Sequence, residues 1–307
     1  MTKKIKKTVI ITGYDCNNMC VFCIDEDKRN LLNKTTEQIK LEMKSARERG
    51  TTYLEFIGGE TFIRPDILKL INSAHKLGFK TINIATNGRM LAYKDFAKKV
   101  VDAGLTDIIF SIHGHNGDLH DKLTNCSGSF EQLIKGFDNM KKLLGLERIG
   151  SNTTIVKQNY KNIEKIGKMI FGMGIRNCEF IFVDPSCGAS FNRFNENVPQ
   201  ISKAAPYIRK CLDIGKINKI EHWHIRYVPL CYFKDYLSQI SELDEVKKFK
   251  SEHLAPDFKN FDVENSRKEI GRIKTGHCEG CKLYDQCEGI WKEYVKNYGD
   301  QELIPVK

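Results

Sequence analysis

Three closely spaced cysteines near the start of the chain are the residues best suited to chemistry. Cys16, Cys20 and Cys23 follow a short apolar run at residues 8–12, in the spacing CxxxCxxC. Thiolates at such spacing are typical ligands of iron–sulfur clusters and of zinc. A four-iron cluster normally takes four cysteines, so three would leave one iron open to another ligand, as an open zinc site does for water. A zinc site or three buried thiols are the alternatives.

Polar and glycine-containing groups follow the next β-rich runs of the chain. They are Gly58, Gly59 and Glu60, then Thr86, Asn87 and Gly88, then Ser111 and His113. Each group alone is typical of a turn. At the carboxyl ends of neighbouring parallel strands, however, they would meet at the edge where such folds place their active sites. There a glycine pair lets a ligand approach the backbone, and a carboxylate can pair with an ammonium group.

These groups need a parallel sheet to bring them together, and the chain alternates β-rich runs with helical patterns as such a sheet requires. Six strands are expected, at residues 8–12, 53–57, 80–85, 107–112, 152–156 and 179–183. Pro65 precedes an apolar helical stripe, and Thr35 with Gln38, like Ser129 with Gln132, has the capping-box spacing of a helix start. Six strand–helix units favour a partial α/β barrel over a closed eight-stranded one.

The regular alternation ends near residue 218. A polar and aromatic run at 222–227 is followed by a highly charged tract at 242–274 and then by a second cysteine group. We therefore expect a partial barrel over residues 1–218 and a small cluster-binding domain over residues 219–307.

The second cysteine group comprises Cys278, Cys281 and Cys287 in the spacing CxxCxxxxxC, with His277 beside it. Taken alone, this spacing fits a structural zinc site and an iron–sulfur cluster equally well. A fourth ligand is expected from Cys231, at the entrance of the smaller domain. Of the other cysteines, Cys187 is left open as a ligand, a radical partner or a loop residue. Packing roles are expected for Cys126, Cys178 and Cys211.

The CxxxCxxC loop and the Gly-Gly-Glu turn together resemble the radical S-adenosylmethionine (radical SAM) superfamily over residues 7 to about 185. That family has an aromatic residue just before its last cysteine, and Phe22 fills this place. The resemblance implies that the three cysteines bind a [4Fe–4S] cluster whose open iron chelates the methionine part of SAM. Phe22 would then contact the adenine, and Glu60 with the neighbouring backbone would receive the methionine ammonium.

Three further residues stand where that family contacts the ribose or methionine part of SAM, namely Asn87, Ser111 and His113. The family's fifth-strand pattern GxIxGxxE is not visible at residues 152–160, so no residue is assigned to the adenine side there. The resemblance also implies the reaction. The reduced cluster splits SAM into methionine and a 5′-deoxyadenosyl radical, which takes hydrogen from an organic substrate. Because the cofactor does this chemistry, few protein acids or bases should be essential.

The second cysteine group is similar to part of the SPASM and twitch domains, which bind auxiliary [4Fe–4S] clusters behind a radical SAM barrel. This similarity implies a cluster on Cys278, Cys281 and Cys287 with Cys231. The full seven-cysteine SPASM pattern is absent, so one auxiliary cluster is expected rather than two. Such clusters resemble those of enzymes that modify ribosomally made peptides, where they accept an electron or bind the substrate.

A peptide side chain is therefore the first expectation for the substrate, although no separate peptide-recognition domain is evident at the amino terminus. A nucleoside, a sugar or another small metabolite is the alternative. A non-catalytic zinc or iron–sulfur protein is a further interpretation, but it would have no use for a Gly-Gly-Glu turn at a strand end. The radical reaction also requires an external one-electron reductant, such as flavodoxin or ferredoxin.

The composition fits a globular protein of one or two domains. The 307 residues carry a formal charge of +10, but the lysines are spread over predicted helices, which favours solvated helix faces over a nucleic-acid surface. The apolar part of the first segment is too short for a signal peptide or a membrane span, so a cytoplasmic location is expected. His222 and His224 alternate as on one face of a strand and are expected to be structural.

Overall fold

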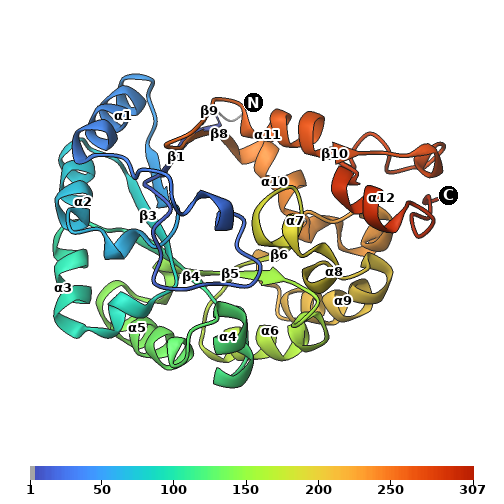
Figure 1. Ribbon diagram of the computed structural model, residues 1–307, viewed down its shortest axis with the longest axis horizontal. Helices are drawn as coiled ribbons and strands as arrows, with labels where there is room; N and C mark the ends of the chain where they lie inside the picture. The colour runs from blue at the N-terminus through green and yellow to red at the C-terminus, as the bar shows by residue number, and fades with distance from the viewer. Residues whose placement is uncertain (1–3) are drawn as a thin grey trace.

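The computed structural model describes residues 4–307, which fold around one large sheet with helices on its outer side (Figure 1). Within these residues, nine strands pair in the order β7-β6-β5-β4-β3-β2-β1-β8-β9. Neighbours from β7 to β8 pair in parallel, and β9 pairs antiparallel with β8. The strands are β1 (Ile5–Ile11), β2 (Tyr53–Ile57), β3 (Thr81–Thr86), β4 (Asp107–Ser111), β5 (Ile149–Ile155), β6 (Asn177–Phe182), β7 (His222–Arg226), β8 (Phe249–Leu254) and β9 (Lys259–Asn260).

Helices connect the parallel strands and form the rim seen in Figure 1. The long connections contain α1 (Thr36–Glu48), α2 (Ile67–Lys76), α3 (Lys94–Asp102), α4 (Gly117–Thr124), α5 (Ser129–Leu144), α6 (Ile163–Gly172), α7 (Gly188–Asn192), α8 (Phe194–Asn197) and α9 (Ile201–Ile217). The last part of the chain contains α10 (Ser241–Lys248), α11 (Val263–Ser266), β10 (Arg272–Ile273), β11 (Ile290–Trp291) and α12 (Lys292–Tyr298). All six strands expected from the sequence are present, as β1 to β6.

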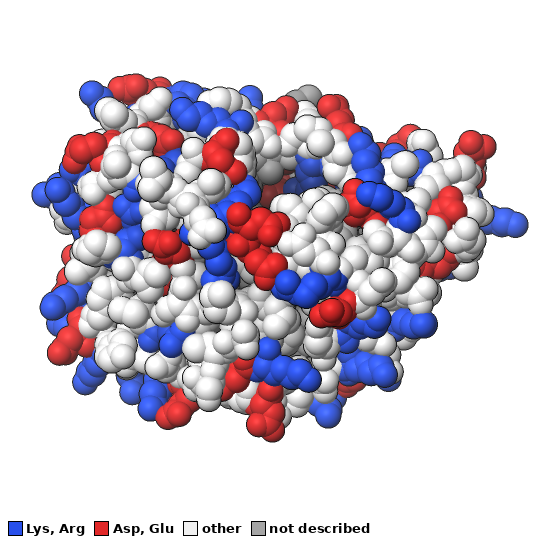
Figure 2. Space-filling model, in the orientation of Figure 1, with Lys and Arg blue, Asp and Glu red and all other residues white. Residues whose placement is uncertain are grey.

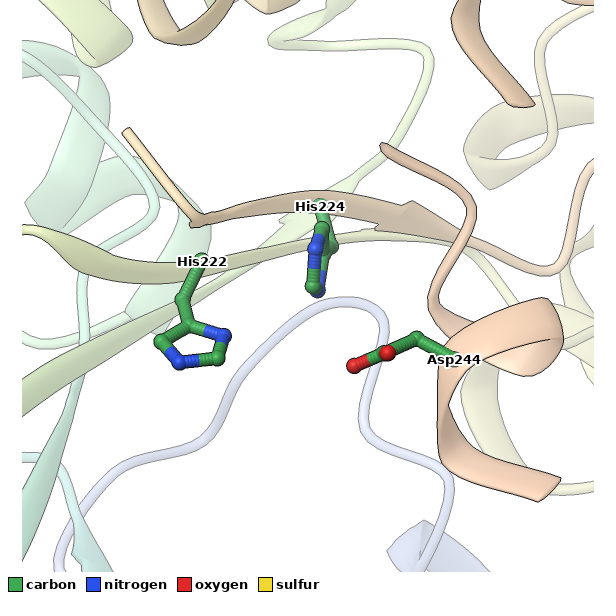
Figure 3. Close-up of side chains that lie close together, drawn as sticks. All are labelled: His222, His224 and Asp244. Atoms are coloured by element: carbon green, nitrogen blue, oxygen red, sulfur yellow. The ribbon is translucent and has the colours of Figure 1, made fainter. Parts of the chain in front are cut away.

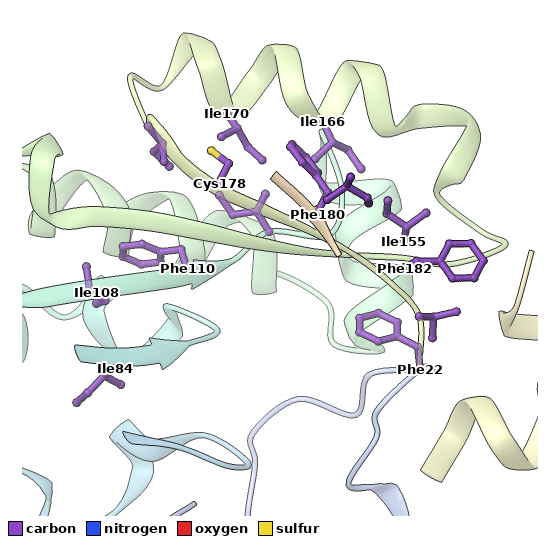
Figure 4. Packing of buried hydrophobic residues seen from close by; sticks show 14 of the residues in the cluster. Phe22, Ile84, Ile108, Phe110, Ile155, Ile166, Ile170, Cys178, Phe180 and Phe182 are labelled. Atoms are coloured by element: carbon purple, nitrogen blue, oxygen red, sulfur yellow. The ribbon is translucent and has the colours of Figure 1, made fainter. Parts of the chain in front are cut away.

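The apolar core lies between the sheet and the outer helices. Figure 4 shows Ile166 and Ile170 of α6 packed over Cys178 and Phe180 of β6, and all four side chains are buried. The opposite, inward faces of the strands carry polar groups instead. Lys7 of β1 forms a salt bridge with Glu55 of β2, whose carboxylate also accepts a hydrogen bond from Asn83 of β3 at 3.2 Å. The barrel interior is therefore polar, and its outer face is apolar.

The two helix starts expected from capping-box spacing have different structures. Thr35 and Gln38 form the reciprocal box at the start of α1, which confirms that prediction. At α5 the prediction is wrong, because Ser129 is already the first helical residue and the N-cap is a glycine in the left-handed conformation. Asp121 stabilises this helix start instead, accepting hydrogen bonds from the Phe130 amide at 2.8 Å and the Gly128 amide at 2.6 Å. An acidic side chain from the preceding helix thus replaces the local cap.

The segment after residue 218 contributes to both ends of the large sheet. Strand β7 pairs with β6, and β8 pairs with β1, so the sheet itself crosses the expected boundary at residue 218. The charged tract at 242–274 is partly buried, because Arg267 bridges Glu245 at 3.2 Å and Glu288 at 2.8 Å. The division into residues 1–218 and 219–307 stays a prediction.

Surface charge is mixed on the face shown in Figure 2, where Lys and Arg side chains alternate with Asp and Glu and no broad basic patch is seen. Acidic side chains lie closest together near the centre of this view. Among residues 4–307, no helix combines the length and the apolar character that crossing a membrane requires.

Candidate active site

A cavity of about 150 Å³ lies at the carboxyl ends of the first strands, beneath the loop that joins β1 to α1. This loop crosses the middle of Figure 1 in dark blue. Eight of the residues expected from the sequence line the cavity together: Cys16, Cys20, Cys23, Gly58, Gly59, Asn87, Ser111 and His113. The strand-end groups and the cysteine motif therefore meet at one place.

The cysteine loop is held from two sides. Its backbone amides at Met19 and Val21 donate to the carbonyls of Thr124 and Leu123, each at 2.9 Å, at the end of α4. On the other side Arg89 donates to the side-chain oxygen of Asn18 at 2.9 Å. Arg89 lies just after the Thr-Asn-Gly turn of β3, and its role was not inferred from the sequence. Arg89 and Asn18 are more than 70 residues apart in the sequence, so no local pattern could have indicated this contact.

Gly58 and Gly59 are required by a close approach of two backbones. A β-carbon on Gly59 would lie 2.0 Å from the carbonyl oxygen of Asp15, and one on Gly58 would lie 2.2 Å from that of Gly13. Gly58 also has a φ of +133°, which side-chain-bearing residues rarely adopt. The approach lets the Gly59 amide donate to Gly13 at 3.0 Å and the Glu60 amide donate to Asp15 at 2.7 Å. The glycine pair thus joins the cysteine loop to the end of β2.

The Glu60 carboxylate is buried and already has protein partners. It accepts hydrogen bonds from the Asn87 amide at 2.7 Å, the Phe62 amide at 3.0 Å and the Thr86 hydroxyl at 2.8 Å. Burial raises the pKa of this carboxyl, and the two backbone donors oppose the shift. In this arrangement Glu60 fixes the turn after β3 rather than lining the cavity. Its expected contact with the methionine ammonium stays a prediction.

His113 presents a defined hydrogen-bond donor to the cavity. Its Nδ1 accepts from the Thr154 amide at 3.2 Å, which assigns the ring proton to Nε2. Burial, with a smaller effect of nearby His120, lowers the pKa of His113 from its ordinary 6.5 to about 3, so the ring is neutral at pH 7. Phe22 packs edge-on against His113 with ring centroids 4.8 Å apart. It also belongs to the buried apolar cluster shown in Figure 4. The adenine contact expected of Phe22 stays a prediction.

The three thiols of the site fit a bound cluster. Burial raises the pKa of Cys16 to about 11 and also raises that of Cys23, so without a metal these groups are protonated thiols. A cluster binds thiolates and must displace these protons. The Asn18 amide donates to the sulfur of Cys16 at 3.4 Å, and the side-chain amide of Asn87 approaches it at 4.0 Å. Hydrogen bonds to sulfur of this kind stabilise thiolate ligands and tune a cluster's potential.

A family comparison agrees with this geometry. Residues 10–170 match the model of the Radical SAM superfamily. This chain belongs to the radical SAM superfamily. Membership identifies it as an enzyme that uses SAM and a [4Fe–4S] cluster, acts on a further substrate and needs a reductant, as expected from the cysteine motif.

Curated relatives of this radical SAM enzyme are named as nucleotide-modifying proteins. A probable GTP 3′,8-cyclase of Saccharolobus solfataricus is 29% identical over 222 residues, which cover 71% of this chain and 69% of that protein. Another, from Sulfurisphaera tokodaii, is 26% identical over 240 residues, which cover 78% of this chain and 73% of the relative.

Solved structures with a similar fold are described with peptides or with SAM. Streptococcus suis SuiB bound to the precursor peptide SuiA has a TM-score of 0.67 at 14% identity, covering 95% of this chain and 73% of SuiB. The protein anSMEcpe with bound AdoMet has a TM-score of 0.67 at 13% identity, covering 98% of this chain and 92% of the other. At such identities the likeness shows the fold alone, and it confirms the expected partial α/β barrel.

The second cysteine group of the radical SAM enzyme converges on one pocket. Cys231, Cys278, Cys281 and Cys287 line it together, with apolar neighbours that include Leu230, Ile290 and Leu303. Backbone amides again donate to sulfur, from Val306 to Cys281 and from Gly289 to Cys287, both at 3.3 Å. Burial, with a smaller effect of the nearby thiols Cys287, Cys278 and Cys281, raises the pKa of Cys231 to about 11.

Within residues 4–307, the potential metal ligands that lie within 4.8 Å of one another in a group of three are His222, His224 and Asp244. The cysteines of the second group, like those of the first, do not form so tight a trio.

The remaining cysteines lie outside both sites. Cys178 and Cys211 are buried in the apolar core, and Cys126 is half-buried near the start of α5. Cys187 lies just after the end of β6, with its sulfur 3.6 Å from the carbonyl oxygen of Ile24 in the cysteine loop. It therefore borders the first site without facing the other three sulfurs in the cavity wall.

Proposed function

We propose that this enzyme reductively cleaves SAM at a cluster bound by Cys16, Cys20 and Cys23, giving a 5′-deoxyadenosyl radical that takes hydrogen from an organic substrate. The observation that carries the proposal is the single cavity that these thiols share with polar groups from three strand ends. Three thiols leave one iron for the cofactor, and the cavity beside them provides room for part of it.

The chain's own groups would bind and orient the cofactor. The Nε2–H of neutral His113 would be a donor for an oxygen of SAM. Asn87, whose side chain also donates to Asn17 at 2.7 Å, lies between the cysteine loop and β3. The buried apolar side chains beside these polar groups, Phe22 among them, would exclude water from the reaction.

We also propose a second [4Fe–4S] cluster, bound by Cys231, Cys278, Cys281 and Cys287. Four thiols around one apolar pocket, with two backbone donors to sulfur, support a cluster with no open iron. Such a cluster would accept an electron from the substrate or pass one on. An external one-electron donor of the flavodoxin or ferredoxin kind would supply the first cluster.

The residues after β6 link the surroundings of the two cysteine sites. The Ala189 amide donates to the carbonyl of Cys23 at 2.8 Å. Burial raises the pKa of Asp184, and the positive charge of Arg272 opposes that shift. Arg272 lies 3.8 Å from the ring centroid of Trp291, four residues beyond Cys287. A substrate bound against the residues that follow β6 would have the SAM site on one side and the second cysteine site on the other.

A peptide side chain is the substrate class that we propose. Support comes from the similar folds of SuiB and anSMEcpe, which extend over 95% and 98% of this chain and so include the second cysteine region. SuiB is described with a bound precursor peptide, and anSMEcpe is described elsewhere with a bound peptide. A nucleotide is the second candidate, because the curated relatives are named as GTP 3′,8-cyclases at about 28% identity.

The two substrates are distinguished by product analysis under anaerobic conditions. The reconstituted enzyme is incubated with SAM, dithionite and either GTP or synthetic copies of short peptides encoded beside its gene. We expect peptide to raise 5′-deoxyadenosine formation above the rate without substrate and to leave with an altered mass. GTP should do neither. If GTP is consumed and raises 5′-deoxyadenosine formation instead, the peptide proposal is wrong and the nucleotide candidate replaces it.

A further inference from the structure

Two histidines and an aspartate converge at the end of the barrel opposite the SAM site. His222 and His224 lie at the start of β7, and Asp244 lies on α10. One ligand atom from each of the three side chains lies within 4.8 Å of the others. Figure 3 shows the His224 ring between the other two, with the Asp244 carboxylate turned toward it. His224 and Asp244 are half-buried, and His222 is the more exposed of the two histidines.

The fold holds these side chains together without a ligand. Alternation along β7 places His222 and His224 on the same face, where their ring centroids are 5.8 Å apart and their planes perpendicular. Arg226, two residues further on that face, bridges Glu179 of β6 at 2.9 Å and Glu245 of α10 at 3.1 Å. This double salt bridge fixes α10 against β7, so the neighbouring Asp244 is held at the histidines.

The trio borders a cavity of about 430 Å³ at the amino-terminal end of the barrel. Side chains from the starts of several strands line it, among them Lys7, Asp107 and Glu179. The SAM cavity lies at the other ends of the same strands, and the two share no lining residue. Ions can therefore reach the trio independently of the cofactor.

We propose that His222, His224 and Asp244 bind a divalent transition-metal ion of the zinc class. Two imidazole nitrogens and one carboxylate oxygen are a common zinc donor set, with the fourth position left to water. The site is distinct from both cysteine sites, and its nitrogen and oxygen donors give it a different metal preference from thiolates.

Lys248 is the group that competes with the ion. Its ammonium lies 2.9 Å from a carboxylate oxygen of Asp244 and 3.7 Å from Glu221. Glu221 in turn lies 3.7 Å from the Nε2 of His222, and Glu179 is a further negative charge near His224. A bound dication replaces the ammonium as the partner of Asp244. The ion would then connect β7 to α10 and stabilise the closed amino-terminal end of the barrel.

The proposal is tested by titrating zinc chloride into the full-length protein with both clusters reconstituted under anaerobic conditions. Calorimetry should show one site, and X-ray absorption at the zinc edge should show nitrogen and oxygen neighbours with imidazole scattering and no sulfur. His224→Ala should abolish this binding, and Asp244→Asn should weaken it at least 10-fold. Lys248→Met should strengthen it several-fold, because the competing cation is removed. A purely structural role for the trio predicts no such gain.

His75→Ala is the matched control, since His75 is exposed on α2 far along the chain from the site, and it should bind zinc as the unaltered protein does. Zinc should also raise the melting temperature of the unaltered protein but not of His224→Ala, whose melting without zinc reports on folding. The proposal is overturned if no zinc binds stoichiometrically, if the zinc has sulfur neighbours only, or if His224→Ala binds as tightly as the control.

Discussion

The two cysteine sites differ in what surrounds their sulfurs. Cys16, Cys20 and Cys23 share a cavity with polar groups from the ends of β3 and β4. The four cysteines near the end of the chain share a smaller pocket whose other walls are largely apolar, with Leu230 and Ile290 among them. Both sites receive backbone hydrogen bonds at sulfur, so the difference lies in the number of thiols and in the residues around them.

This difference indicates how similar cysteine ligands can have different functions within one chain. Three thiols leave an iron free, but only a neighbouring polar wall can bind and orient a second molecule on it. In the function that we propose, four thiols would complete a cluster, and an apolar wall would limit it to holding or transferring electrons. The number of thiols and the wall, which is built from residues far apart in the sequence, would together determine the function of each site.

The largest expected effect comes from removing the thiols of the first site. Replacing Cys16, Cys20 and Cys23 together by alanine should abolish 5′-deoxyadenosine formation with SAM and dithionite, because no iron remains for the cofactor. The protein should stay brown and keep iron and sulfide equivalent to one four-iron cluster. Undiminished 5′-deoxyadenosine from this variant would contradict the assignment of the first site.

Removing the second group in that background separates iron from zinc. Further replacement of Cys278, Cys281 and Cys287 by alanine should abolish the remaining iron and sulfide, measured by elemental analysis. Retention of one zinc and no iron in the first triple variant would instead make the second site a structural zinc site.

The fourth ligand is tested separately in the same background. Cys231→Ala should change the spectrum of the remaining cluster, because its sulfur lines the same pocket as the other three. Cys126→Ala is the control, since Cys126 lies outside that pocket and should leave the spectrum unchanged.

An intermediate effect is expected at the contact between the glycine turn and the cysteine loop. Gly59→Ala places a methyl group 2.0 Å from a backbone oxygen of Asp15, so the loop must shift. Overpacking of this kind typically costs about 1–3 kcal/mol, or roughly a 5- to 150-fold weaker affinity for SAM, measured by equilibrium dialysis. Gly172→Ala is the matched control, because nothing lies within 4 Å of its added methyl group. Equal SAM affinities in the two variants would remove the turn from the cofactor site.

The smallest expected effect is a loss of folding stability at acidic pH, caused by the burial of a titratable side chain next to the first site. Burial lowers the pKa of His120, which supports the His113 backbone at 3.3 Å, from its ordinary 6.5 to about 4. The unfolded chain therefore takes up this proton first, and stability falls as the pH falls below 6.5. Between pH 6.5 and 5.5 the free energy of unfolding should drop by about 1 kcal/mol from this group.

Denaturant unfolding at several pH values measures this loss. His120→Asn, which keeps a hydrogen-bond acceptor without the titrating ring, should show a shallower decline than the unaltered protein. His75→Asn, at an exposed position on α2, is the control. The same steep decline in all three proteins would show that other groups cause it.

Much of the fold and of the first site follows from local patterns. The sequence predicts the six strands, the capping box at Thr35 and the meeting of the strand-end groups, because apolar periodicity and turn residues lie next to each other in the chain. The convergence of Cys231 with the later cysteines was also expected, although its role as a ligand stays a prediction.

The features that could not be predicted from the sequence depend on contacts between residues that are far apart along the chain. Strand β8 has the sequence FKSEHL and lacks an apolar alternation, because polar residues lie on both of its faces: Ser251 lies beside Lys7, and Glu252 on the other face accepts a hydrogen bond from Thr8. Nothing in the highly charged tract at 242–274 indicated which of its charges form ion pairs, such as the largely buried pair of Arg267 and Glu245. Likewise, nothing in the spacing of Glu60 indicates that its carboxylate bonds to the backbone after β3.

The pairing of β1 with β8 has a consequence for how the protein is made. Ile5 pairs with Phe249, so one edge of β1 stays without its neighbour until about 240 further residues have left the ribosome. Unpaired strand edges readily join other chains. A chain stopped before residue 249 would thus be prone to aggregate, even though it contains the complete cysteine loop and all of residues 10–170. The edge of β1 that pairs with β8 is therefore protected only long after β1 itself has been synthesised.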